Sequence, residues 1–287
     1  MCRAAGKTAF LVALFASISL CGTVSHTASG DELPPGFVRL KSVVPNVRQD
    51  IRYATPNNFV GRPIPGYESG ECWLRREAAE RLAQVQADLA TFWLQLIVYD
   101  CYRPIRAVEY FVRWARDPSD QSRKAEHYPT IDKSRLLSEG YIAAVSAHSK
   151  GVAVDVGVAR LGAAEDAGVD MGTAFDFFGP ASHTASPLIS SAARRNRMLL
   201  LSVMSRRGFR NYGREWWHFS LPEAQRLPGY DVPIRPSRAT SARRRSAGSH
   251  ELVDAAVLGQ SGVDIALLVD ADAGGHGGSP CGLSSSR

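Results

Sequence analysis

The segment from Ser146 to Val158 constrains the fold more than any other part of the chain. Valine alternates with smaller residues from Val152 to Val158, and this period of two is typical of a β-strand. In such a strand the valines share one face, whereas Ala153, Asp155 and Gly157 share the other. The sequence therefore predicts a strand that carries a carboxylate among small neighbours.

A carboxylate in that setting suits a metal ligand or a catalytic group in a cleft. Gly151 allows a tight turn directly before the strand, which would let His148 fold back toward Asp155. The alternative is an ordinary turn followed by a strand with one exposed aspartate, and the spacing alone does not decide between the two.

The remaining apolar patterns indicate an α+β fold. They predict helices over residues 74–92, 105–116 and 191–207, and strands over 94–100, 152–158 and 216–221, with a further possible strand over 50–53. Strands separated by long and dissimilar connections favour an antiparallel or mixed central sheet flanked by helices.

The N-terminal residues 1–29 have the pattern of a secretory signal peptide. Arg3 and Lys7 precede an apolar core of about 12 residues, and small polar residues follow. A short membrane anchor is the alternative, although such a core is short for a bilayer. A lipid anchor at Cys21 is disfavoured because Leu20 stands where a small residue is expected. We expect export to the periplasm or the medium, with no stable membrane insertion after the signal is removed.

The C-terminal residues 235–287 contain no aromatic residue and many Ser, Ala and Gly. This composition predicts a disordered tail and leaves 30–234 as the folded domain. The 34 Lys and Arg residues exceed the 28 Asp and Glu residues by six, but they are spread along the chain. Nucleic acid is therefore not an expected partner, and the oligomeric state stays open.

Export would permit disulfides. Cys72 precedes the first predicted helix and Cys101 follows the strand 94–100, so a bridge between them would close a loop of 101 − 72 = 29 residues. Such a bridge contributes about 3 kcal/mol in the chain-entropy model. Two buried thiols are the alternative.

A second chemically notable segment runs from Gly213 to Phe219. His218 lies among aromatic residues, which is typical of a core histidine, but Glu215 lies three residues upstream. A metal site that hydrolyses a substrate needs both an imidazole and a nearby base. These two side chains would point to opposite faces of a regular strand, so we expect the chain to bend or bulge there.

Together His148, Asp155 and His218 offer two imidazoles and one carboxylate, a set that suits one Zn²⁺ per chain with a fourth position open for water. The chain has no His-Glu-x-x-His helix. Glu215 could accept a proton from the water and pass it to a leaving amine. Arg103, placed on a loop by Pro104, could stabilise an oxyanion.

Four motifs in order resemble one enzyme family. They are Tyr-Arg-Pro at 102–104, Ser-x-His-x-x-Gly-x-Ala-x-Asp at 146–155, Asp-Met-Gly-Thr-x-Phe-Asp at 170–176 and Glu-x-Trp-His at 215–218. The chain is similar over about residues 38–230 to the zinc D-alanyl-D-alanine dipeptidases, relatives of the vancomycin-resistance dipeptidase.

The resemblance implies that His148, Asp155 and His218 hold zinc, that Glu215 is the general base and that Arg103 polarises the scissile carbonyl. It places Ser146 and the segment that begins at Asp170 near the site without a firm role. The implied fold is the α+β one shared with D-alanyl-D-alanine carboxypeptidases and the hedgehog signalling domain.

Three functional hypotheses follow. The first is hydrolysis of the free D-Ala-D-Ala dipeptide, with residues 105–145 capping the pocket against longer peptides. Because the chain looks exported, wall turnover or D-alanine scavenging fits it better than glycopeptide resistance, which acts on a cytoplasmic precursor. The second is a D,D-carboxypeptidase that acts on wall peptides. The third is a non-catalytic, zinc-binding, hedgehog-like module, against which Glu215 and Arg103 argue.

Four other residues receive structural interpretations. His127 and His183 lie in polar connections and are expected at the surface or behind the ligands. Trp216 and Trp217 are expected to pack in the wall and core rather than stack on substrate.

Overall fold

The valine-rich segment forms β5, Ala153–Arg160, at the centre of a five-stranded sheet. The computed structural model describes residues 33–164 and 168–237, and the predicted signal peptide and nearly all of the predicted tail lie outside them. The other strands are β1 (Phe37–Arg39), β2 (Arg48–Gln49), β3 (Trp73–Arg75), β4 (Leu94–Asp100), β6 (Arg210–Asn211) and β7 (His218–Ser220). The helices are α1 (Arg76–Ala90), α2 (Ile105–Arg116), α3 (Lys124–His127) and α4 (Ser191–Arg206).

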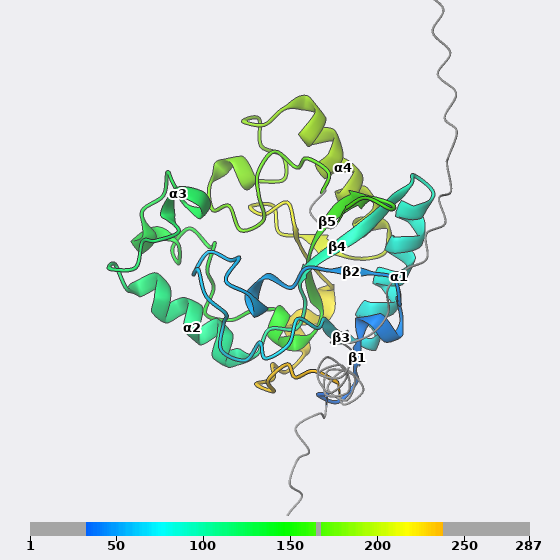
Figure 1. Ribbon diagram of the computed structural model, residues 1–287, viewed down its shortest axis with the longest axis horizontal. Coiled ribbons are helices and arrows are strands. Elements are labelled where there is room, and N and C mark those ends of the chain that lie inside the picture. The colour runs from blue at the N-terminus through cyan, green and yellow to red at the C-terminus, as the bar shows by residue number, and fades with distance from the viewer. Residues whose placement is uncertain (1–32, 165–167, 238–287) are drawn as a thin grey trace, which may run out of the picture. The chain divides into compact units, whose positions relative to one another are not determined.

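The central sheet has the order β2-β4-β5-β7-β6. The β2–β4 pair is parallel and the other three pairs are antiparallel, which makes the sheet mixed. Strands β1 and β3 form a separate antiparallel pair. In Figure 1, α1 and α4 lie to one side of β4 and β5, whereas α2 and α3 lie to the other. The α+β prediction with a mixed sheet flanked by helices is confirmed.

Seven of the eight residues of β5 are buried, so both of its faces are covered. On the face of β5 that carries Ala153, Asp155 and Gly157, the residues must be small because other side chains pack against it. A Cβ added at Gly157 would lie 2.7 Å from the Tyr99 hydroxyl oxygen. Asp155 is therefore buried, and the alternative of one exposed aspartate is wrong.

The helices follow the spacing of their apolar residues. In α1 the buried side chains of Ala78, Leu82, Val85 and Leu89 recur every three or four positions and form one face. Helix α4 begins where the Ser190 hydroxyl accepts a hydrogen bond from the Ala193 amide. Strand 94–100 and helix 105–116 have the predicted bounds.

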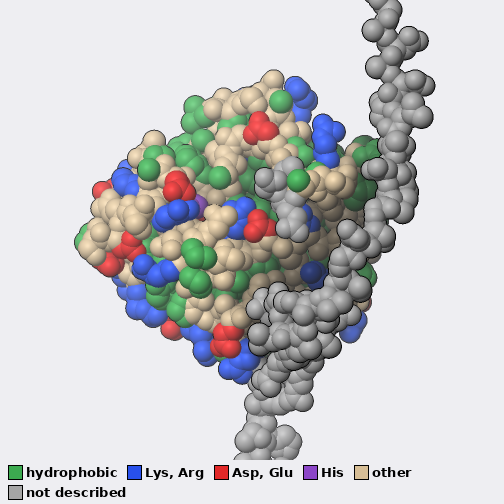
Figure 2. All heavy atoms as spheres, viewed as in Figure 1, with side chains coloured by type: hydrophobic (Ala, Val, Ile, Leu, Met, Phe, Trp, Pro, Cys, Tyr) green, Lys and Arg blue, Asp and Glu red, His purple; other side chains and the backbone are tan. Residues whose placement is uncertain are grey.

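The possible strand over 50–53 is wrong. The pairing with β4 takes place earlier, at Arg48–Gln49, and Arg52–Ala54 forms a 3-10 turn. Cys72 and Cys101 form the predicted disulfide, which excludes the alternative of two thiols. Over the described residues, no helix has both the length and the apolar character that a bilayer span requires. On the face shown in Figure 2, basic and acidic side chains are interspersed.

Candidate active site

Three adjacent strands bring Asp100, Asp155 and His218 next to one another. The register pairs Asp100 of β4 with Asp155 of β5, and Asp155 with His218 of β7. Directly opposed residues on neighbouring strands have their side chains close together on the same face. Residues that are far apart in the sequence are thus collected at one point of the sheet.

His148 reaches the same point from a short 3-10 turn, His148–Lys150, just before β5. Gly151 ends the turn in the left-handed region at φ 73°, and its amide donates to the His148 carbonyl over 2.9 Å. A Cβ at this position would also overlap the ring of Phe37. The predicted tight turn at Gly151 is confirmed, and it directs His148 back toward Asp155.

The three side chains present their donor atoms to one another. His148 Nε2 lies 3.1 Å from His218 Nδ1 and 3.3 Å from Asp155 Oδ1, and His218 Nδ1 lies 2.9 Å from Asp155 Oδ1. A tetrahedral ion with ligand distances of about 2.0–2.1 Å requires ligand atoms about 3.3 Å apart. The donor set therefore fits a small divalent cation.

The protonation states also suit metal binding. The Nδ1–H of His148 donates to the Cys101 carbonyl over 2.6 Å, which leaves Nε2 with a free lone pair when the ring is neutral. Burial acts to raise the pKa of Asp155, but His148 and His218 outweigh it and hold that pKa below its usual range. Burial lowers the pKa of His218. A carboxylate and neutral imidazoles are the forms that bind a metal.

Glu215 lies in the turn between β6 and β7. Its amide donates to the Tyr212 carbonyl over 2.8 Å, and β7 begins only at His218, so the chain bends as predicted. Glu215 is 8% exposed, and no hydrogen bond within the described residues reaches its carboxylate. Burial and then the neighbouring Asp155 raise the pKa of Glu215 well above its usual value.

Arg103 follows the end of β4 and is held by two carboxylates. Its Nη2 lies 2.8 Å from Asp100 Oδ2 and 3.5 Å from Asp155 Oδ2, and its Nε donates to Asp100 Oδ2 over 3.0 Å. Nη1 takes part in none of these contacts to Asp100 and Asp155. Because Arg103 lines the pocket, the N–H groups of Nη1 can donate to a ligand.

All five predicted site residues line one pocket of about 300 Å³. This volume is at the lower end of the range for small-molecule sites. The pocket has aromatic walls that include Phe111 and Trp217, and residues 140–143 and 145–147 line it as well. Part of the predicted cap over 105–145 thus lines the pocket, namely Phe111 and residues 140–143 and 145.

Tyr53 was not predicted at the pocket, and Asp176 was predicted only as part of the motif 170–176, which was placed near the site without a role. Asp176 is buried at the pocket wall, and the Tyr53 hydroxyl lies 3.0 and 3.2 Å from its two carboxylate oxygens. Burial, followed by the charge of Asp155, raises the pKa of Asp176 well above its usual value. Asp176 closes the motif that begins at Asp170, so the motif could have identified it. Asp170 itself is exposed and does not line the pocket.

His127 was expected at the surface or behind the ligands, and the surface is excluded because its side chain is buried and its Nδ1 lies 3.0 Å from the Asp176 carbonyl. His183 is half-buried, with Nε2 2.9 Å from the Tyr141 hydroxyl. Trp216 and Trp217 are buried, in agreement with the packing role expected for them.

Comparison with known proteins gives a family for this chain. Residues 34–236 match the peptidase family model described as D-Ala-D-Ala dipeptidase. A D-alanyl-D-alanine dipeptidase of Enterococcus faecium is 40% identical over 201 residues, which cover 70% of this chain and 98% of that protein. Proteins of the same name from Streptomyces coelicolor and Escherichia coli are 36% and 32% identical, over 69% and 67% of this chain and 98% and 88% of their own lengths. The match spans nearly all of the described residues, and this chain therefore belongs to the D-Ala-D-Ala dipeptidase family of peptidases.

Proposed function

We propose that this chain is a zinc-dependent dipeptidase that hydrolyses free D-alanyl-D-alanine. The observation that carries the proposal is the convergence of His148, Asp155 and His218 donor atoms in the pocket that Glu215 and Arg103 also line. The names of the relatives support the substrate, since each is called a D-alanyl-D-alanine dipeptidase.

The metal would be held by His148 Nε2, His218 Nδ1 and a carboxylate oxygen of Asp155. Bound Zn²⁺ would supply Lewis acidity toward the scissile carbonyl and would make a water molecule acidic enough to lose its proton near neutral pH. The Cys101 carbonyl fixes the tautomer of His148, because only Nδ1 faces that acceptor.

Glu215 is the proton carrier in this scheme. Its carboxylate accepts no hydrogen bond from the described residues, so nothing competes for the proton that it takes from water. Its raised pKa makes the resulting carboxyl group a competent acid toward the departing amine. General acid–base catalysis of this kind typically contributes about 10²–10⁴ in rate.

Arg103 stabilises the negative charge that develops on the carbonyl oxygen. Asp100 and Asp155 fix the Nε and Nη2 edge of the guanidinium, which leaves Nη1 for the substrate. A donor that is oriented before the reaction costs no reorganisation when the charge appears.

The pocket chemistry also favours a short substrate with a free amine. The buried carboxylate of Asp176 can receive an ammonium group, and Tyr53 restricts its orientation. The small pocket volume and the lining by residues 140–143 and 145–147 leave little room for a longer peptide. In the cell we assign the enzyme to wall turnover or D-alanine scavenging outside the membrane, in line with the predicted signal peptide.

The test is a substrate panel assayed on purified protein. We expect fast hydrolysis of D-Ala-D-Ala, little of L-Ala-L-Ala, N-acetyl-D-Ala-D-Ala and a wall pentapeptide, and loss of activity with a metal chelator that added zinc reverses. Faster cleavage of the pentapeptide would replace the proposal with the carboxypeptidase, and zinc binding without cleavage of any peptide would favour the non-catalytic module.

A further inference from the structure

The four residues Asp100–Arg103, at the end of β4, hold two groups of the proposed site. The Cys101 carbonyl accepts from His148 Nδ1 over 2.6 Å, and the Arg103 amide donates to the His148 carbonyl over 3.3 Å. Asp100 binds the guanidinium of Arg103 and lies 3.4 Å from His148 Nδ1. The position of this short segment therefore sets the direction in which His148 and Arg103 point.

The sheet gives this segment little support. The register between β4 and β5 shifts between Val98 and Asp100, and the pairing ends at the Asp100–Asp155 pair. Beyond that point the Tyr102 amide donates to the Trp73 carbonyl of β3 over 2.9 Å, and the disulfide joins Cys101 to Cys72, the residue before β3. The disulfide is the covalent member of this attachment, and it acts on the residue whose carbonyl holds His148.

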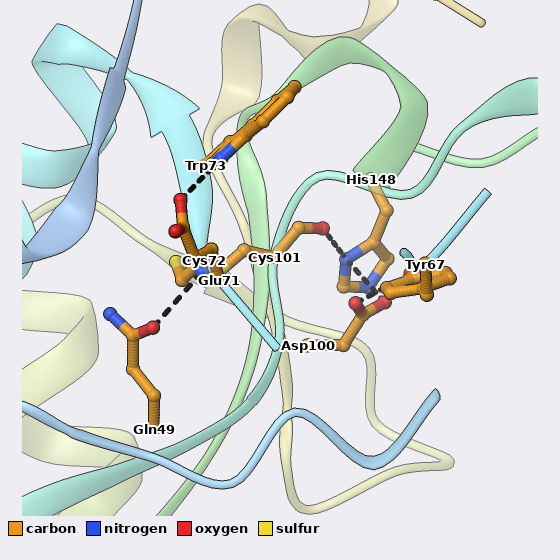
Figure 3. Close-up of a disulfide and its surroundings, with 8 residues drawn as sticks. All are labelled: Gln49, Tyr67, Glu71, Cys72, Trp73, Asp100, Cys101 and His148. Atoms are coloured by element: carbon orange, nitrogen blue, oxygen red, sulfur yellow. Dashed lines mark hydrogen bonds and ion pairs between the residues drawn. A yellow bond between two sulfur atoms is a disulfide. The ribbon is translucent and has the colours of Figure 1, made fainter. Parts of the chain in front are cut away.

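The other end of the bridge is well anchored. The Cys72 amide donates to Gln49 Oε1 over 3.1 Å, and the Cys72 carbonyl accepts from the Leu40 amide over 2.9 Å. Both cysteines are at most 2% exposed. Figure 3 shows the contacts in series, with Gln49 bound to Cys72, the bridge to Cys101, and the Cys101 carbonyl directed at the His148 ring.

We infer that the Cys72–Cys101 disulfide is a positioning device of the metal site, which holds the Cys101 carbonyl where it orients His148. The inference rests on the proposed function, because it assigns the bridge a role toward the metal. Opening the bridge leaves the ligands in the chain but gives Cys101 freedom to move, so the imidazole loses its fixed tautomer and direction. The zinc site of this chain therefore has its full affinity only in an oxidising compartment, where the disulfide persists.

A bridge with a purely structural role predicts a different result. Closing a 29-residue loop stabilises the whole fold by constraining the unfolded chain. Loss of that effect lowers the melting temperature but leaves the metal affinity of the folded protein unchanged. Metal affinity measured well below the melting temperature therefore separates the two roles.

The first experiment compares the double variant Cys72→Ala/Cys101→Ala with wild type and with Leu200→Ala. Leu200 is fully buried in α4 and does not line the pocket, so its truncation destabilises the fold without touching the site. Zinc affinity is measured by competition with a chromophoric chelator. We expect about tenfold weaker zinc binding in the double variant, the lower end of the effect of losing a partner of a ligand histidine, and no change in Leu200→Ala.

The second experiment keeps the inference testable if the double variant does not fold. Folded wild type is reduced with a water-soluble phosphine, which gives two electrons to the disulfide and becomes a phosphine oxide; water supplies the oxygen and the two thiol protons. We expect the chelator to extract zinc several-fold faster from the reduced protein, and reoxidation to restore the slow rate.

The outcomes are distinct. Zinc affinity within twofold of wild type in the folded double variant, or unchanged zinc release with both thiols titratable, overturns the positioning role. Wild-type protein that neither binds zinc nor cleaves the dipeptide overturns the proposed function instead.

Discussion

Replacement of Glu215 by glutamine separates catalysis from stability. The change keeps the size of the side chain and removes the proton acceptor, so kcat should fall by about 10²–10⁴, the usual contribution of a general base. This loss corresponds to about 3–5 kcal/mol of transition-state stabilisation. Zinc content should remain at the wild-type level, because Glu215 is not one of the three residues whose donor atoms converge.

The same substitution should leave the fold as stable as wild type or more stable. Burial raises the pKa of Glu215, so the folded protein binds this proton more tightly than the unfolded chain does. The contribution of Glu215 to the free energy of unfolding of wild type therefore decreases as pH rises above about 4.3, the pKa of glutamate in the unfolded chain. The neutral amide of glutamine does not titrate and has no such loss. In the metal-free protein, the free energy of unfolding of Glu215→Gln should therefore exceed that of wild type by a margin that grows from pH 4 toward neutrality.

The assay combines steady-state hydrolysis of the dipeptide with thermal melts of metal-free protein at several pH values. Glu80→Gln is the matched control, since it makes the same chemical change on an exposed residue of α1. More than a tenth of wild-type kcat in Glu215→Gln would refute the general-base role. A melting temperature several degrees below wild type at neutral pH would refute the burial argument.

Three further predictions concern other parts of the chain. Arg103→Lys should lower kcat by about 10² with zinc content unchanged, because a single ammonium cannot both pair with Asp100 and reach the substrate, as kinetics with metal analysis would reveal. Burial lowers the pKa of His127, so the unfolded chain takes up this proton first, and as pH drops from 7 to 5 the free energy of unfolding of wild type should decrease relative to that of His127→Asn; urea melts in which this difference does not change with pH would contradict the assignment. Gly151→Ala should be destabilised, since its φ of 73° disfavours alanine and the new Cβ overlaps the Phe37 ring, and an unchanged melting temperature would argue against the tight turn.

Much of the fold followed from local patterns. The strand 94–100 and the helix 105–116 were placed at their observed bounds because their apolar runs end at clear signals, such as Pro104. Among the short strands, β7 lies within the predicted strand 216–221, but β1, β2, β3 and β6 were not predicted. β2 has two residues and β1 and β3 have three each, and segments of that length are defined by the partner strand rather than by their own composition.

The convergence of the site was predictable where motifs carried it and not elsewhere. His148, Asp155 and His218 were proposed as a set from their motifs, and they meet because β5 and β7 pair in one register. Tyr53 lies in a 3-10 turn without any motif, and it reaches Asp176 only through the tertiary fold. A motif shows which reactive side chains are close in the sequence, whereas the contact between Tyr53 and Asp176 depends on how distant segments pack.

The most direct test of the central claim is a zinc titration of metal-free protein with activity measured at each step. The account predicts that activity rises linearly and saturates at one zinc per chain, and that His148→Ala neither retains the ion nor gains activity. Full activity in protein shown by elemental analysis to contain no metal would contradict it, as would tight zinc binding that survives the loss of His148.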